Sequence, residues 1–117
     1  YVEDLVEAIR RLIDAAPIRP ESAEDIAEGD SLSPVAPWRV VNIGNSKPVQ
    51  LGDMIAAIEG ALGMEAKRNL MPMQPGDVPA TWADAELLKS LTGYVPKTDL
   101  REGVQRFVEW YRDYYQE

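Results

Sequence analysis

Hydrophobic side chains recur at helical spacing in four separate stretches of the chain. In the first stretch the apolar positions follow the spacing i, i+1, i+4, i+7 and i+8, and they are Leu5, Val6, Ile9, Leu12 and Ile13. This spacing places all of them on one face of a helix. The pattern predicts a first helix over residues 3–15, and Pro17 ends it because proline cannot continue a helix.

The same periodicity predicts three further helices, over residues 50–62, 85–92 and 99–115. Gly63 and Gly93 directly follow two of these stretches, and glycine is typical of the position after a helix. Most of the helical framework can therefore be assigned from the apolar pattern and its glycine stops.

Polar residues before two of the helices are suited to capping them. Asp84 is expected to be the N-cap of the helix over 85–92, because its carboxylate can accept hydrogen bonds from amides two or three residues on. Thr98 is expected to cap the last helix, and Asp99 favours the first turn of that helix.

Two short segments have the character of strands. Residues 38–43 form a β-branched run that ends at Gly44-Asn45-Ser46, and residues 66–71 are a possible second strand. Residues 17–37 carry four prolines and predict a loop with one turn around 23–27. Two short strands are too few for an independent sheet. Either the domain is mostly helical, or its strands join a sheet that lies elsewhere.

Composition narrows the possible functions. The chain has 117 residues, which fits one domain over 1–117, and a formal net charge of −8. This charge argues against nucleic acid or an anionic membrane as the main partner. The chain has no cysteine and no histidine, so it offers no thiolate and no histidine-based acid or base, and we expect no metal site. Because it also has no long apolar run, a cytoplasmic location is the simplest expectation.

The loop over residues 71–84 has the most unusual composition in the chain. Its three prolines, at positions 72, 75 and 79, fix the backbone and remove amide donors. Gly76 permits a tight turn and close approach of a ligand, and Asp77 follows it. The Asp77 carboxylate could accept two hydrogen bonds from a ribose diol, while Gln74 could donate to a phosphate or carbonyl oxygen. The alternative is a structural loop in which Asp77 forms an Asx-turn.

Several short motifs occur in a fixed order along the chain. They are Tyr1-Val2-Glu3-Asp4, Val41-Asn42-Ile43-Gly44-Asn45, Met73-Gln74-Pro75-Gly76-Asp77-Val78 with Thr81-x-Ala83-Asp84, Gly93-Tyr94-x-Pro96, and Gly103-Val104-x-x-Phe107-Val108-x-Trp110-Tyr111. In this order they resemble the C-terminal part of the extended short-chain dehydrogenase/reductase family, the NAD-dependent nucleotide-sugar epimerases and dehydratases. The UDP-glucuronate 4-epimerases are the branch with the most similar ending.

The resemblance implies a fold class. It is an α/β fragment with four main helices and two or three short strands, the substrate-binding C-terminal part of an extended Rossmann-type enzyme. The family's glycine-rich NAD-binding turn and its Tyr-x-x-x-Lys pair would lie in a cofactor domain upstream of residue 1. We therefore expect no catalytic and no cofactor-binding residue here, and no activity of this part alone. The intact enzyme would use NAD and would be a homodimer.

The resemblance also implies roles for single residues. Asp77 matches the carboxylate that holds the ribose hydroxyls of the uridine nucleotide, and Gly76 precedes it. Gln74 stands where many relatives have an arginine that contacts the diphosphate. Asp4 is interpreted as structural, and Asn42 and Gly44 as strand-end residues. The aromatic side chains of Trp82, Trp110 and Tyr111 are interpreted as packing residues.

The reaction implied for the intact enzyme is epimerisation of a UDP-sugar at C4. The sugar is oxidised transiently to a 4-keto intermediate, and hydride then returns to the other face. Two alternatives stay open: a nucleotide-sugar dehydratase or decarboxylase of the same family, and a stand-alone acidic interaction module.

Overall fold

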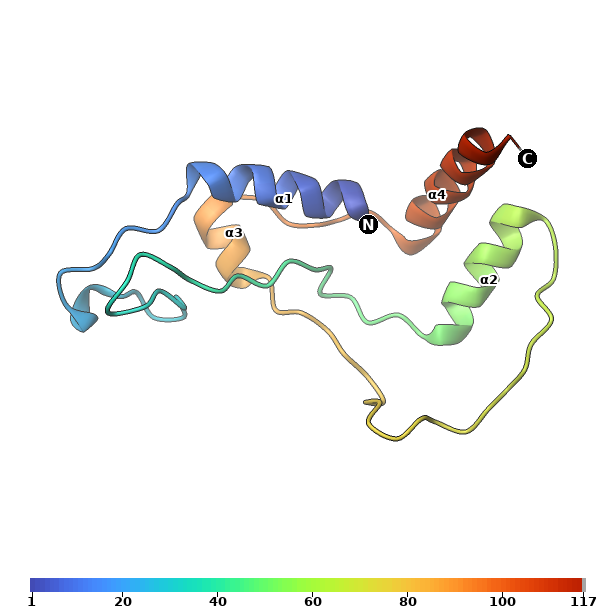
Figure 1. Cartoon of the computed structure of the whole chain (residues 1–117), viewed down its shortest axis with the longest axis horizontal. Coiled ribbons are helices and arrows are strands. Elements are labelled where there is room, and N and C mark those ends of the chain that lie inside the picture. The colour runs from blue at the N-terminus through green and yellow to red at the C-terminus, as the bar shows by residue number, and fades with distance from the viewer. Residues whose placement is uncertain (117) are drawn as a thin grey trace. The chain divides into compact units, whose positions relative to one another are not determined.

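The computed structural model describes residues 1–116 and contains four α-helices and one short 3₁₀ helix (Figure 1). In chain order they are α1 (Val2–Asp14), η1 (Ala23–Asp25), α2 (Leu51–Leu62), α3 (Glu86–Thr92) and α4 (Leu100–Tyr115). All four predicted α-helices are confirmed, and each observed end lies within one residue of the predicted one. Gly63 and Gly93 follow α2 and α3 with the left-handed φ angles 72° and 67°, which glycine adopts without strain.

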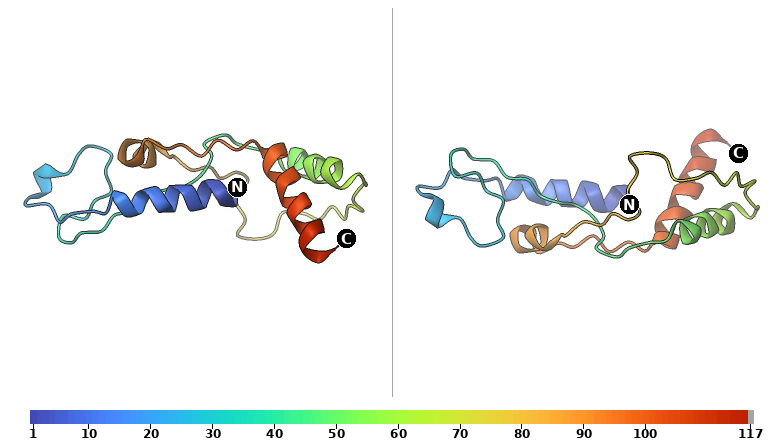
Figure 2. Two further views of the ribbon diagram at one scale, coloured as in Figure 1. Left: turned by 90° about the horizontal axis from the view of Figure 1, so that it is seen from above. Right: turned by 90° about the horizontal axis from the view of Figure 1, so that it is seen from below.

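The chain divides into two compact units, which are described separately. The first consists of Tyr1, residues 47–81 and residues from 98 onward, and the second of residues 2–46 and 82–97. In the first unit α2 packs against α4, and the views of Figure 2 agree on this pairing. Val104 and Val108 of α4 are buried there. The side chain of Arg112 donates to the carbonyl oxygen of Leu62 at 2.9 Å, which satisfies an acceptor at the C-terminal end of α2.

The second unit is built around α1 and α3. Ala8 of α1 and Leu88 of α3 have no exposed surface, and Ala85 beside them is 5% exposed. The two helices contact each other, and the small side chain of Ala8 is fully buried on α1. Burial in this unit thus depends on few residues, and Leu88 contributes the largest fully buried side chain among the described residues.

The α/β fold class is wrong for the part of the chain that the structure describes, because residues 1–116 contain helices and no strand. The segment over 38–43 is extended, but its hydrogen bonds do not form a ladder. The Val40 amide donates to Oγ of Ser31 at 3.0 Å, and the same hydroxyl donates to the Val40 carbonyl. Ser33 donates its amide to the Trp38 carbonyl oxygen at 2.9 Å. A serine side chain thus occupies polar groups that a neighbouring strand would otherwise use.

The possible strand over 66–71 is also absent from the described structure. The Ala66 amide donates to the Glu59 carboxylate at 3.0 Å, and Leu70 is 90% exposed. Pairing with other strands is what stabilises a β-strand, and no other strand lies in the described residues to pair with this segment.

Candidate functional site

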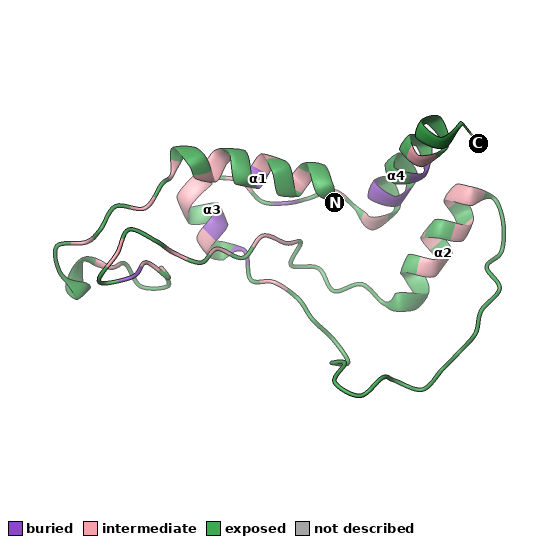
Figure 3. Cartoon of the chain, viewed as in Figure 1, coloured by how far each residue is buried: buried purple, intermediate pink, exposed green. Residues whose placement is uncertain are grey.

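The loop over residues 71–84 contains the predicted substrate-binding residues and is almost entirely exposed (Figure 3). At its centre the Asp77 amide donates to the Gln74 carbonyl oxygen at 3.2 Å and closes a four-residue turn. Pro75 is the second residue of this turn and Gly76 the third, with a φ of 94°. Proline followed by a residue with positive φ is the signature of a type II turn. The structure therefore confirms a tight turn that depends on Pro75 and Gly76.

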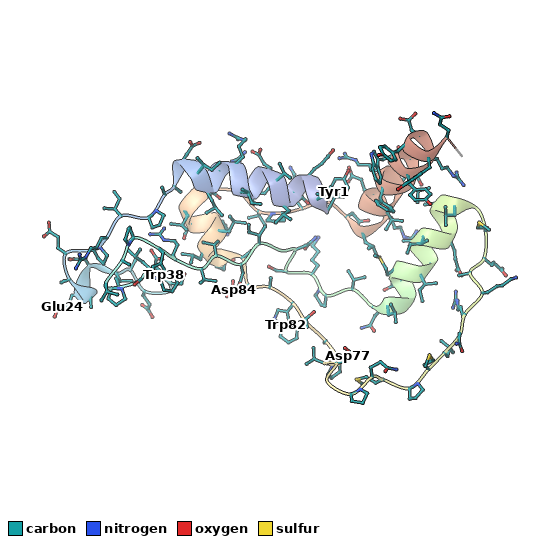
Figure 4. All side chains as sticks on the ribbon, viewed as in Figure 1. Tyr1, Glu24, Trp38, Asp77, Trp82 and Asp84 are labelled. Atoms are coloured by element: carbon teal, nitrogen blue, oxygen red, sulfur yellow. The ribbon has the colours of Figure 1, made fainter. Side chains whose placement is uncertain are left out.

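The turn brings the backbones of two predicted ligand-binding residues close together. Gln74 and Asp77 are its first and last residues, and both are exposed. Figure 4 shows the Asp77 side chain on this open part of the chain. The turn is closed by the backbone, so the Asp77 carboxylate is not required to form it. The assignment of Gln74, Gly76 and Asp77 to substrate binding stays a prediction.

The C-terminal base of the loop is held more firmly than its centre. Oδ1 of Asp84 accepts a hydrogen bond from the Glu86 amide at 2.9 Å. The N-cap position of α3 is Ala85, so the prediction that Asp84 is the cap residue is wrong by one position. The carboxylate nevertheless satisfies an amide of the first turn, two residues on, as expected. The prediction that Thr98 caps α4 is also wrong by one position. The N-cap of α4 is Asp99, whose side chain accepts a hydrogen bond from the Arg101 amide at 2.9 Å.

Two residues of the turn after residue 43 contact this base. A Cβ atom added at Gly44 would lie 2.8 Å from Cβ of Ala83. Oγ of Ser46 donates to the Ala83 carbonyl oxygen at 3.1 Å. Sequence reasoning assigned Gly44 to strand-end turn geometry and did not select Ser46. Gly44 does not have a positive φ, so close approach to Ala83 is the reason for glycine here.

The segment that leads into the loop is anchored to α2. Glu59 accepts hydrogen bonds from the Ala66 amide at 3.0 Å and from Nη2 of Arg68, which lies 3.0 Å from both carboxylate oxygens. These donors, with the Ala66 amide first, lower the pKa of the Glu59 carboxyl. This anchor could not be predicted from the sequence, because no regular spacing relates a helical carboxylate to the loop that follows.

A polar cluster connects α1 to the segment after α3. Oη of Tyr94 donates to Oδ1 of Asp4 at 2.7 Å, and the Arg11 guanidinium lies 4.9 Å from the Tyr94 ring centroid. Burial and the bond to Asp4 raise the Tyr94 pKa to about 12. Hydrogen bonds from Arg10 and Arg11 lower the Glu7 pKa to about 2. In the structure Asp4 thus makes a structural contact, the hydrogen bond from Tyr94.

The three aromatic residues interpreted as packing residues differ in the structure. Trp82 is 72% exposed, so the packing interpretation is wrong for it within the described structure. Trp110 is half exposed and stacks on Tyr114 with ring centroids 5.4 Å apart. Tyr111 is less exposed and contacts Phe107 and Tyr115.

Residues 1–116 contain neither a metal-binding cluster nor a membrane-spanning helix. No three or more acidic, histidine or cysteine side chains gather there in an arrangement that could hold a metal ion. In the same residues, each helix is too short or too polar to cross a membrane.

The chain is similar over nearly its whole length to curated proteins, although no family model matches it. It is 48% identical over 115 residues to the "Uncharacterized 37.6 kDa protein in cld 5'region" of Escherichia coli O111:H-. It is 45% identical over 115 residues both to "Protein CapI" of Staphylococcus aureus and to the "Probable UDP-glucuronate 4-epimerase" of Rhizobium meliloti (strain 1021). Each match covers 98% of this chain and 34% of the relative.

The chain thus spans about a third of the length of these relatives. Because the match covers 98% of this chain, it extends over nearly all of the residues around the 71–84 loop and the 44–46 turn. The chain corresponds to the C-terminal part of proteins of the UDP-glucuronate 4-epimerase family.

Proposed function

We propose that the full-length protein is an NAD-dependent UDP-glucuronate 4-epimerase and that this chain holds the nucleotide part of its substrate. The observation that carries the proposal is the 45% identity, over 98% of this chain, with the relative named "Probable UDP-glucuronate 4-epimerase". The exposed turn from Gln74 to Asp77 supports it, because it offers polar groups suited to a nucleoside diphosphate.

In this proposal Asp77 binds the ribose. A carboxylate has two oxygens and accepts several hydrogen bonds, so it can hold the two vicinal hydroxyls of a ribose. Gly76 precedes it with a φ of 94° and carries no side chain, so the sugar can approach the backbone. A ribose can reach the Asp77 carboxylate only if Asp77 is exposed, and Asp77 is exposed in this loop.

Gln74 is proposed to donate its side-chain amide to an oxygen of the diphosphate. It lies at the start of the turn that ends at Asp77, so one turn can contact both the diphosphate and the ribose of the nucleotide. A neutral amide contributes less binding energy to a diphosphate than an arginine, which forms charge-assisted bonds. We therefore assign Asp77 the larger share of the binding.

Binding of the nucleotide by these residues would contribute to catalysis by positioning the sugar. The uridine nucleotide does not react, but energy from binding it can orient the hexuronic acid whose C4 changes configuration. The residues of this chain do not fit the cofactor, because the sequence has neither a glycine-rich dinucleotide turn nor a Tyr-x-x-x-Lys pair. NAD binding and proton transfer are therefore assigned to residues outside this chain, and the chain alone is proposed to be inactive.

The test is an NMR assay of the full-length protein with NAD and UDP-glucuronate. The expected product is the C4 epimer of the substrate at equilibrium with it, and no turnover by the 117-residue chain alone. Loss of water from the sugar, or release of carbon dioxide, would overturn the proposal in favour of a dehydratase or a decarboxylase. Absence of any reaction by the folded full-length protein would overturn it in favour of a binding module.

A further inference from the structure

The contact between Gly44 and Ala83 is the tightest that any glycine of the chain makes. All eight glycines lie in the described residues, and Gly44 is the one at which an added Cβ would come within 3.0 Å of another atom. The atom it would meet, Cβ of Ala83, is bonded directly to the backbone. Because that atom cannot rotate away, any side chain at position 44 would displace the backbone at Ala83.

A hydrogen bond fixes the same point from the neighbouring residues. Oγ of Ser46 donates to the carbonyl oxygen of Ala83 at 3.1 Å. One residue further on, Asp84 accepts from the Glu86 amide and connects the base of the loop to α3. Gly44, Ser46 and Ala83 belong to the same compact unit, and we call these three residues the loop clamp.

Ala83 of the clamp lies close in sequence to Asp77, the residue proposed to bind the ribose. Six peptide units connect Asp77 to Ala83, and Pro79 restricts the backbone among them. From Pro72 to Trp82 every residue is exposed, so few protein contacts hold these residues, and a ligand that binds them has to restrict the freedom that remains. Ordering one residue costs about 1–2 kcal/mol of conformational entropy. Residues that are already fixed do not add to that cost.

We propose that Gly44 is a positioning residue for nucleotide-sugar binding: it lets Ala83 seat against the 44–46 turn and so fixes the C-terminal base of the loop that carries Asp77. Ser46 secures the seat through its hydrogen bond. The clamp does not contact the substrate and acts only through Ala83. The inference rests on the proposed function, because it assigns the clamp to the same loop.

The experiment measures KM and kcat for UDP-glucuronate in the full-length protein. Gly44→Ala is expected to raise KM about tenfold, the equivalent of one residue that must newly be ordered, with kcat little changed. Ser46→Ala is a milder second variant, in case Gly44→Ala does not fold, and should raise KM about threefold. The double variant Gly44→Ala/Ala83→Gly should restore KM to that of Ala83→Gly alone, because it removes the Cβ that the new methyl group would meet.

Gly60→Ala is the matched control, because an added Cβ there meets nothing within 4 Å and the residue lies within α2. It should leave KM unchanged. The inference is overturned if folded Gly44→Ala and Ser46→Ala keep the wild-type KM, or if kcat falls while KM does not rise. Absence of rescue by Ala83→Gly would also overturn it. Asp77→Ala measured in parallel separates the two proposals: if KM rises for Asp77→Ala alone, the clamp fails and the proposed function stands.

Discussion

The centre of the 71–84 loop and its C-terminal base differ in how they are held. The central turn has one backbone hydrogen bond, from Asp77 to Gln74, and every residue from 72 to 82 is exposed. The base is fixed by Ser46, by the close approach of Gly44 to Ala83 and by the bond from Glu86 to Asp84. It continues directly into the buried Ala85 and Leu88.

This difference indicates how a binding loop can be both specific and open. The prolines and Gly76 fix local backbone angles, so the central turn forms without a surrounding core. The base belongs to the other compact unit and is held by contacts of its own. A ligand that contacts Gln74 and Asp77 would then complete the order of the loop, which is typical of binding loops placed on a firmer scaffold.

The largest effect is expected from the buried core of α3, into which the base of the loop continues. Leu88→Ala removes the largest fully buried side chain of the described residues and should reduce the free energy of unfolding by about 2–5 kcal/mol. Leu70→Ala makes the same chemical change at a 90% exposed position just before the loop, and should alter the stability by less than about 0.5 kcal/mol. Urea denaturation of the full-length variants measures both. Similar losses for the two variants would contradict the comparison.

A smaller effect is expected from the polar contact beside α3. Tyr94→Phe removes the hydrogen bond to Asp4 and should cost about 1.5–3 kcal/mol, the range for bonds to charged groups. The folded-state pKa of Tyr94 is raised to about 12 from its usual 10. The protonated hydroxyl is therefore favoured by folding, so its stabilising contribution is complete below pH 10 and is lost as the pH rises through 12.

The check on Tyr94 is the stability difference between wild type and Tyr94→Phe, measured by urea denaturation from pH 8 upward. The difference should be constant up to about pH 10 and should then shrink. A tyrosinate absorbance titration of the same two proteins gives the pKa directly. A difference that grows with pH would show that the sign of this linkage is wrong.

The smallest effect on stability is expected at the centre of the loop. Gly76→Ala places a side chain at a φ of 94° and should cost about 1 kcal/mol or less, because the exposed turn can relax. Under the proposed function it should nevertheless raise KM for UDP-glucuronate, since the relaxed turn no longer presents Asp77 correctly. A loss of stability as large as that of Leu88→Ala, with KM unchanged, would contradict this comparison. It would mean that the centre of the loop stabilises the fold and does not present Asp77 to the substrate.

The helices could be predicted from the sequence because each carries its own periodic apolar face, and glycine marks two of their ends. The cap positions at Asp84 and Asp99 were harder, since a carboxylate can reach the free amides of a first turn from neighbouring positions. The strand expected over 38–43 was wrong, because strand formation depends on a partner and Ser31 occupies both polar groups of Val40.

The candidate site shows the same limit. The turn at Pro75 and Gly76 could be predicted because its geometry depends on adjacent residues. The contact of Ser46 with Ala83 spans 37 positions and that of Asp4 with Tyr94 spans 90, and no local pattern encodes either. The sequence therefore indicated the turn and the single residues Gly44 and Asp84, but not the long-range contacts of Ser46 with Ala83 and of Asp4 with Tyr94.

We propose that Asp77 binds the ribose at the exposed centre of a loop whose C-terminal base is held by protein contacts. KM and kcat of Asp77→Ala for UDP-glucuronate in the full-length protein test it most directly, with NAD affinity as the control. Losing the hydrogen bonds to a carboxylate should raise KM by about tenfold to a hundredfold and leave NAD affinity as in wild type. A folded Asp77→Ala protein with the wild-type KM would contradict the claim.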